Sequence, residues 1–101
     1  PVFITQPLLY GYGVDPITGT DLSKVKVKEN MNGALYWQKL ELYNDQTRRL
    51  CAESQVELID LAKILQKSSQ YFFDEMHYTN EGSMMVGGII AHELEGILNQ
   101  K

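Results

Sequence analysis

The residues with the clearest chemical potential are Asp74 and His77, in the run Asp74-Glu75-Met76-His77. Side chains three residues apart in a helical turn lie on one side, so the Asp74 carboxylate can reach a ring nitrogen of His77. A carboxylate bonded to Nδ1–H fixes the imidazole tautomer and stabilises the imidazolium that forms when Nε2 accepts a proton. The spacing predicts the acid–base half of a hydrolytic triad. It also allows a simpler interpretation, in which Asp74 caps a helix and His77 is half-buried at its entrance.

Two short strands are expected to position this pair. Residues 2–5 are β-branched or aromatic and are followed by Pro7, which cannot donate to a strand ladder. Residues 56–59 predict a second strand of the same kind. Between the two lies a glycine-punctuated loop from Leu8 to Asn32, in which alternating lysines at 24, 26 and 28 indicate a short edge strand.

Three helices are expected around these strands. The longest covers about residues 34–54, with Asn32 as its N-cap. A short one runs over residues 61–67 after a capping Asp60. The last runs from Thr79 or Asn80 to about Leu98.

Apolar spacing predicts which faces of the two long helices are buried. In the final helix the buried stripe is expected to include Met85, Ile89, Leu94 and Ile97, and Gly87-Gly88 to allow close approach to a sheet. In the first helix the solvated face is expected to hold Lys39, Glu41, Asp45, Arg48 and Arg49. Its buried face is expected to hold Tyr36, Leu40, Tyr43, Thr47 and Leu50, with Cys51 beside it.

The order strand, helix, strand, helix predicts an α/β fold with parallel strands joined by crossovers. Two parallel strands do not make a stable sheet, because parallel sheets are buried on both faces and need more strands. We therefore expect residues 1–101 to be the C-terminal portion of one larger α/β domain.

The run from Tyr71 to Ser83 resembles the last conserved block of the SGNH (GDSL-type) hydrolases, with its Asp-x-x-His turn and its Thr-x-x-Gly helix start. Residues 2–7, 37–44 and 56–62 are similar to the preceding segments of that family, in the same order. The resemblance implies a three-layer α/β/α, flavodoxin-like fold. It also implies a serine esterase that uses no metal or cofactor, in which His77 is the general base and Asp74 orients it.

The chain departs from that family at the nucleophile. The Gly-Asp-Ser motif and the oxyanion-hole blocks of the family precede its last triad turn, and the sequence lacks them. No serine or asparagine here is assigned to either role. We therefore expect the chain to be inactive alone and to associate with a missing N-terminal half or with another copy. Two alternatives stay open: a non-catalytic binding module that kept the fold, and a standalone interaction domain.

The expected substrate is a small-molecule ester: a lipid, a small acyl ester or an acetylated sugar. Ligands of open α/β sheets bind beyond the carboxyl ends of the strands. This rule places the segment Leu8, Leu9 and Tyr10, after the first strand, in the pocket together with Met76.

Composition and the remaining motifs exclude other classes of protein. The formal net charge of −4 disfavours binding of nucleic acid through bulk charge, and no apolar run approaches the ~20 residues of a membrane span. Cys51 is the single cysteine, so an internal disulfide is impossible. His92-Glu93 lacks the second histidine of a zinc-protease helix, since position 96 is Gly96.

Overall fold

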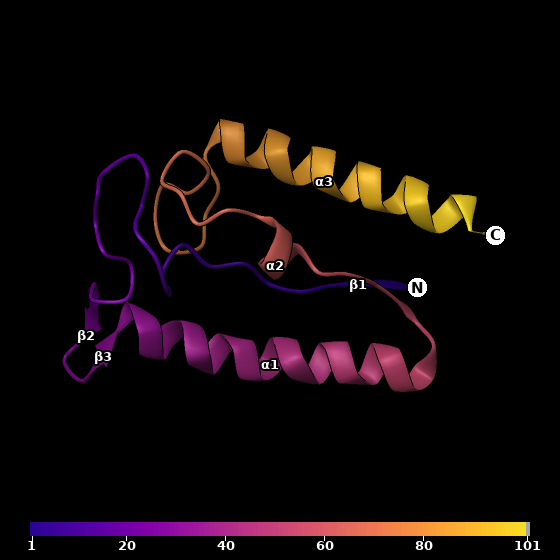
Figure 1. The fold of residues 1–101 in the computed structure, drawn as a ribbon, viewed down its shortest axis with the longest axis horizontal. Coiled ribbons are helices and arrows are strands. Elements are labelled where there is room, and N and C mark those ends of the chain that lie inside the picture. The colour runs from indigo at the N-terminus through magenta and orange to yellow at the C-terminus, as the bar shows by residue number, and fades with distance from the viewer. Residues whose placement is uncertain (101) are drawn as a thin grey trace.

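Two parallel strands lie between the two long helices of the chain (Figure 1). β1 (Val2–Ile4) pairs with β4 (Glu57–Ile59), with Val2 opposite Glu57 and Ile4 opposite Ile59. The structure is a computed structural model that describes residues 1–100. It shows a mixed α/β domain with a small parallel sheet, and both strands lie within one residue of their predicted positions.

The helices are α1 (Gly33–Ser54), α2 (Leu61–Ile64) and α3 (Asn80–Asn99). Both α1 and α3 contact β4, and Figure 1 shows them on opposite sides of the strands. Asn32 caps α1 as predicted, because its side chain accepts a hydrogen bond from the Leu35 amide. None of the described helices has the length and apolar character needed to cross a membrane.

The predicted short helix differs from α2 in two respects. It ends at Ile64 rather than at position 67, because Leu65 adopts an extended conformation. Asp60 occupies the N-cap position, but its side chain makes no capping hydrogen bond. The carboxylate of Asp60 instead accepts hydrogen bonds from Thr5 and Arg48.

The lysine-rich segment forms a small hairpin. β2 (Lys26–Lys28) pairs antiparallel with β3 (Met31–Asn32), directly before α1. The predicted edge strand is therefore present and shorter, and its partner is the residue pair that leads into the helix.

The prediction of which residues form the buried face of α1 is partly wrong. Tyr43 and Leu50 are 74% and 58% exposed, whereas Asn44 is buried. Arg48, expected in solvent, has a side chain that is only 22% exposed. Asn44 and Arg48 point inward because they bind Gln6 and Asp60, which follow the two strands, and apolar spacing alone cannot predict such partners.

The inner stripe of α3 is also only partly confirmed. Ile89 packs against the core, but Met85 is 40% exposed. A Cβ added at Gly87 or at Gly88 would have nothing within 4 Å, so these glycines do not lie against the sheet. With two strands present, the sheet is too narrow to cover this part of the helix.

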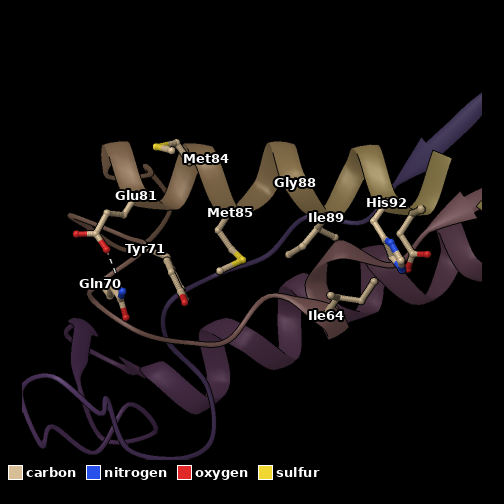
Figure 2. A pocket seen from close by; sticks show the side chains of 10 residues that line it. Ile64, Gln70, Tyr71, Glu81, Met84, Met85, Gly88, Ile89 and His92 are labelled. Atoms are coloured by element: carbon tan, nitrogen blue, oxygen red, sulfur yellow. Dashed lines mark hydrogen bonds between the residues drawn. The ribbon is translucent and has the colours of Figure 1, made fainter. Parts of the chain in front are cut away.

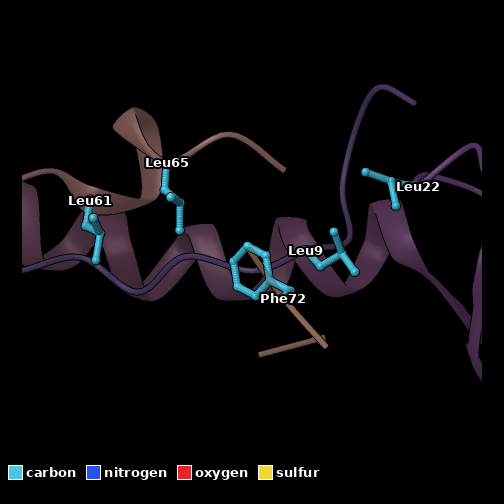
Figure 3. Packing of buried hydrophobic residues seen from close by; sticks show 5 residues of the cluster. All are labelled: Leu9, Leu22, Leu61, Leu65 and Phe72. Atoms are coloured by element: carbon cyan, nitrogen blue, oxygen red, sulfur yellow. The ribbon is translucent and has the colours of Figure 1, made fainter. Parts of the chain in front are cut away.

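The core is built around the long segment before α1, which we expected to be a loop. Leu9 and Leu22 of this segment are buried together with residues from α2 and from the stretch before α3 (Figure 3). Buried Asp15 holds the segment in place by accepting hydrogen bonds from the amides of Ile17 and Ser69. The core cluster consists of Leu9, Leu22, Leu61, Leu65 and Phe72.

Both outer edges of this two-stranded sheet are unpaired among the described residues, and the edge of β1 is the more exposed of the two. β1 has β4 on one side and no strand on the other. Its side chains Val2, Phe3 and Ile4 are 37%, 49% and 44% exposed. An apolar strand with a bare edge is a surface on which another strand can add.

Candidate catalytic dyad

The Asp74–His77 turn is anchored in the core at its two ends. Phe72, which is 1% exposed, forms a β-bridge with Tyr78, and their rings lie 5.4 Å apart. Inside this bridge the Phe73 amide donates a hydrogen bond of 3.0 Å to the His77 carbonyl. The turn is therefore a closed loop whose base is fixed by packing and whose tip carries the ionisable residues.

The Asp74 carboxylate uses its two oxygens for different tasks. Oδ1 accepts hydrogen bonds from the amides of Met76 at 2.9 Å and His77 at 2.7 Å, whereas Oδ2 lies 2.8 Å from His77 Nδ1. The backbone hydrogen bonds from His77 and Met76, and then the His77 side chain, lower the pKa of Asp74. Asp74 is therefore ionised at neutral pH, and the predicted contact between the two side chains is present.

The geometry also fixes the tautomer of His77. An ionised carboxylate can only accept, so Nδ1 carries the proton and Nε2 is left with a lone pair. The ring stacks on Phe73 with centroids 5.6 Å apart and planes 20° from parallel. The His77 side chain is 64% exposed, and Nε2 makes no hydrogen bond to any residue between 1 and 100. Nε2 is thus free to take a proton from a group brought to it.

The start of α3 explains why a Thr-x-x-Gly pattern follows the dyad. Thr79 Oγ1 accepts a hydrogen bond from the Gly82 amide at 2.9 Å and donates one of 2.6 Å to the Gln70 carbonyl. A Cβ on Gly82 would lie 1.9 Å from the Tyr71 carbonyl oxygen. Only glycine lets the helix begin this close to the strand-like residues before the turn.

The four residues predicted to contact substrate are placed as follows. Leu8 and Leu9 are buried, at 1% and 8% exposure, so their side chains belong to the interior. Tyr10 is half-buried, and burial, followed by the charges of Glu75 and Asp74, raises its pKa. Met76, at the tip of the turn, is 41% exposed.

A backbone hydrogen bond joins the Leu8–Tyr10 segment to the dyad. The Leu9 amide donates to the Glu75 carbonyl at 2.9 Å. The structure therefore brings the segment after β1 next to the Asp74–His77 turn. Whether these residues contact a substrate stays a prediction.

Sequence reasoning missed Lys67. Its Nζ lies 3.3 Å from the centroid of the Trp37 ring and donates a hydrogen bond of 2.6 Å to the Leu8 carbonyl. Burial lowers the pKa of Lys67 to about 8, against a smaller opposing effect of Glu41. A single lysine after a short helix has no motif, so the sequence alone offers no signal for this contact.

A hollow between α2 and α3 has a volume of about 540 Å³ (Figure 2). Ile64, Tyr71, Met85 and Ile89 give it a mainly apolar wall. Neither member of the dyad lines it. Across residues 1–100, no three His, Cys, Asp or Glu side chains gather in a way that would hold a metal ion.

No serine among the described residues completes a triad with Asp74 and His77. Ser68 is fully buried, and Ser23 donates to Asp21. No hydrogen bond joins His77 to a serine between positions 1 and 100. No family model, curated protein or solved structure matches the chain. The functional interpretation therefore rests on the geometry of the dyad.

Proposed function

We propose that this chain is the C-terminal portion of a serine esterase of the SGNH type, with the three-layer α/β/α architecture of that family. In this proposal Asp74 orients His77, and His77 is the general base. The carrying observation is the 2.8 Å contact between His77 Nδ1 and Asp74 Oδ2, with Nε2 facing solvent. The serine and the oxyanion-hole donors come from residues that precede Pro1.

The proposed reaction is acyl transfer in two steps. His77 Nε2 takes the proton of the serine hydroxyl as its oxygen attacks the ester carbonyl, and the same proton then goes to the departing alkoxide. In the second step a water molecule attacks the acyl carbonyl and gives a proton to Nε2. The bond from the acyl carbon to the serine oxygen then breaks, this oxygen takes the proton from Nε2, and the carboxylic acid is released. The ionised Asp74 supports both steps because it stabilises the imidazolium.

The surface of the chain supports the proposal that a further segment covers it. The unpaired edge of β1 and its exposed apolar side chains fit addition of a strand from the N-terminal half, or from another copy. The exposed dyad fits the same arrangement, because a triad serine has to be brought to Nε2 from outside residues 1–100. The alternative, a binding module without nucleophile, predicts the same fold but no turnover.

The test uses the full-length natural polypeptide that contains this chain. It is assayed with p-nitrophenyl acetate, with longer acyl esters and with an acetylated sugar. A fluorophosphonate probe labels the nucleophile. We expect hydrolysis, and we expect His77→Ala to lower kcat by at least about 10³-fold because the general base is lost.

His92→Ala is the matched control. His92 is the other histidine of the chain, lies exposed on α3 and makes no hydrogen bond with the dyad turn among the described residues. It should leave kcat unchanged. Turnover by a folded His77→Ala protein at the wild-type rate would overturn the proposed mechanism. Absence of any turnover, with no labelled serine, would favour the binding module.

A further inference from the structure

Lys67 connects three parts of the chain that are distant in sequence. Its ammonium group lies over the Trp37 ring of α1 at 3.3 Å and donates to the Leu8 carbonyl at 2.6 Å. The charge of an ammonium is attracted to the face of an indole ring, and its hydrogen bond to a carbonyl is stronger than a neutral one. Lys67 therefore holds the segment after β1 against α1.

Gly11 shows how closely the segment after β1 lies on the side chains of Lys67 and Trp37. A Cβ at Gly11 would lie 2.8 Å from Lys67 Cε and 3.0 Å from Trp37 Cγ. The φ angle of Gly11 is +146°, which other residues rarely adopt. The backbone thus packs directly on the Lys67–Trp37 contact.

The same segment reaches the dyad one residue further along. Leu8 accepts the hydrogen bond from Lys67, and the next residue, Leu9, donates its amide to the Glu75 carbonyl at 2.9 Å. Glu75 lies between Asp74 and the two residues whose amides bind Asp74 Oδ1. Two consecutive residues therefore link the lysine to the turn that carries the proposed base.

We infer that Lys67 is a positioning residue for the Asp74–His77 dyad, acting through the Leu8–Leu9 backbone. This inference rests on the proposed function for its activity readout, but the geometric link can be tested without turnover. Lys67 does not contact the dyad itself. Its substitution is therefore expected to change kcat and the environment of His77 and to leave KM unchanged.

Protonation of Lys67 gives the inference a specific pH signature. Burial lowers the pKa of Lys67 to about 8, so the Trp37 contact weakens as the pH rises through this value. Of the charged groups on packed elements, Glu41 of α1 raises this pKa, and Arg48 binds the Glu41 carboxylate. The Leu8–Gly11 segment contributes one titratable side chain, Tyr10, whose pKa is raised from its ordinary value by burial. The helix that precedes Lys67, α2, contributes Lys63.

The test compares Lys67→Met and Lys67→Arg in the full-length protein, with Lys63→Met as the control. Arginine keeps its charge at high pH, stacks on aromatic rings and can donate to a carbonyl. We expect Lys67→Met to lower kcat about tenfold with KM unchanged, because a small displacement of a catalytic group is enough for such a loss. Lys67→Arg should restore kcat at neutral pH, and Lys63→Met should have no effect.

The pH profile separates positioning from a purely structural role. Wild-type kcat should fall as the pH rises through about 8, the pKa of Lys67 in the fold, and Lys67→Arg should remove this fall. In protein labelled with ¹⁵N-histidine, the His77 ring signals should shift in Lys67→Met and stay in place in Lys67→Arg. If Lys67→Met does not fold, the dependence of kcat on pH in Lys67→Arg tests the positioning role.

The outcomes distinguish this inference from the proposed function. A full-length protein without esterase activity contradicts the proposed function, while the ring signals still test the link. Unchanged kcat and unchanged His77 signals in Lys67→Met, or a fall above pH 8 that persists in Lys67→Arg, would overturn the positioning role.

Discussion

Asp60 and Asp74 are both paired with a basic side chain, but the two pairs differ in how many of their polar atoms are used. Asp60 binds Arg48 through two contacts of 2.9 Å and accepts a third hydrogen bond of 2.8 Å from Thr5. The remaining guanidinium donors bind Glu41 and Asp45. Both carboxylate oxygens of Asp60 and all three guanidinium nitrogens of Arg48 have partners among the described residues.

The Asp74–His77 pair is incomplete by the same measure. Asp74 is fully used, by two amides and by the ring of His77. The second ring nitrogen of His77 has no partner among residues 1–100 and lies on an exposed side chain. A saturated network stabilises a fold, whereas a pair with one oriented and unused basic atom can act on another molecule.

The largest effect should come from Asp74→Asn in the full-length protein. The amide can keep the contacts with the backbone, but its NH₂ group would donate to Nδ1 and move the proton of His77 to Nε2. The base would then be blocked, and we expect kcat to fall by about 10⁴-fold with little change in stability. The measurement is ester turnover alongside urea denaturation.

Glu75→Gln is the matched control for this change. Glu75 is the neighbouring carboxylate, and its link to the rest of the chain is a backbone one, from the Leu9 amide to its carbonyl. It should keep kcat within about twofold. A similar loss in both variants would mean that the charge of the turn matters and the tautomer does not.

Arg48→Met should have the opposite profile, a loss of stability without a loss of chemistry. It leaves the partly buried Asp60 carboxylate without its main partner, so the free energy of unfolding should fall by about 3 kcal/mol. Arg49→Met, on the exposed side of the same helix, should change it by less than about 0.5 kcal/mol. Equal effects of both variants on urea denaturation would contradict the saturated network.

The same variant should alter the acid sensitivity of the fold. Burial alone would raise the pKa of Asp60, but hydrogen bonds from Arg48 and Thr5, with the charge of Arg48, lower it overall. The ionised carboxylate therefore stabilises the fold above the ordinary aspartate pKa of about 3.9, and this stability is lost as the pH falls below it. Arg48→Met should flatten the dependence of stability on pH in that range.

The difference between the two pairs also explains what the sequence could predict. Asp74 and His77 are three residues apart, so a local spacing was sufficient to predict their contact. Asp60 and Arg48 are 12 residues apart, and Asp60 and Thr5 are 55 apart. The sequence predicts an exposed Arg48, because apolar spacing carries no information about Asp60, a partner that only the folded chain brings close.

The long segment before α1 shows the same limit. Its glycines indicated a loop, yet Leu8 and Leu22 are among the most buried residues of the chain. The buried carboxylate of Asp15 makes this possible by satisfying the amides of Ile17 and Ser69. The element types and order followed from local patterns, whereas the faces depended on such distant contacts.

The smallest effects come from two glycines of α3, which separate the support of the dyad turn from the rest of the helix. Gly82→Ala would place a Cβ 1.9 Å from the Tyr71 carbonyl oxygen, next to the turn. The start of the helix would have to shift, and we expect a destabilisation of about 2 kcal/mol. The NMR signals of the His77 ring should also shift, because the Thr79 amide donates to the same Tyr71 carbonyl.

Gly87→Ala is the same chemical change five residues later, where nothing lies within 4 Å of the new Cβ. Alanine is the better helix former, so the free energy of unfolding of the chain should rise by about 0.5–1 kcal/mol with no effect at His77. The comparison becomes sharper in the full-length protein. If added strands cover this part of α3, the new methyl group meets them and the stabilisation disappears. A gain in stability that persists there would mean that the glycine face of α3 is in solvent in the whole protein as well, and that the proposed covering segment lies on β1 alone.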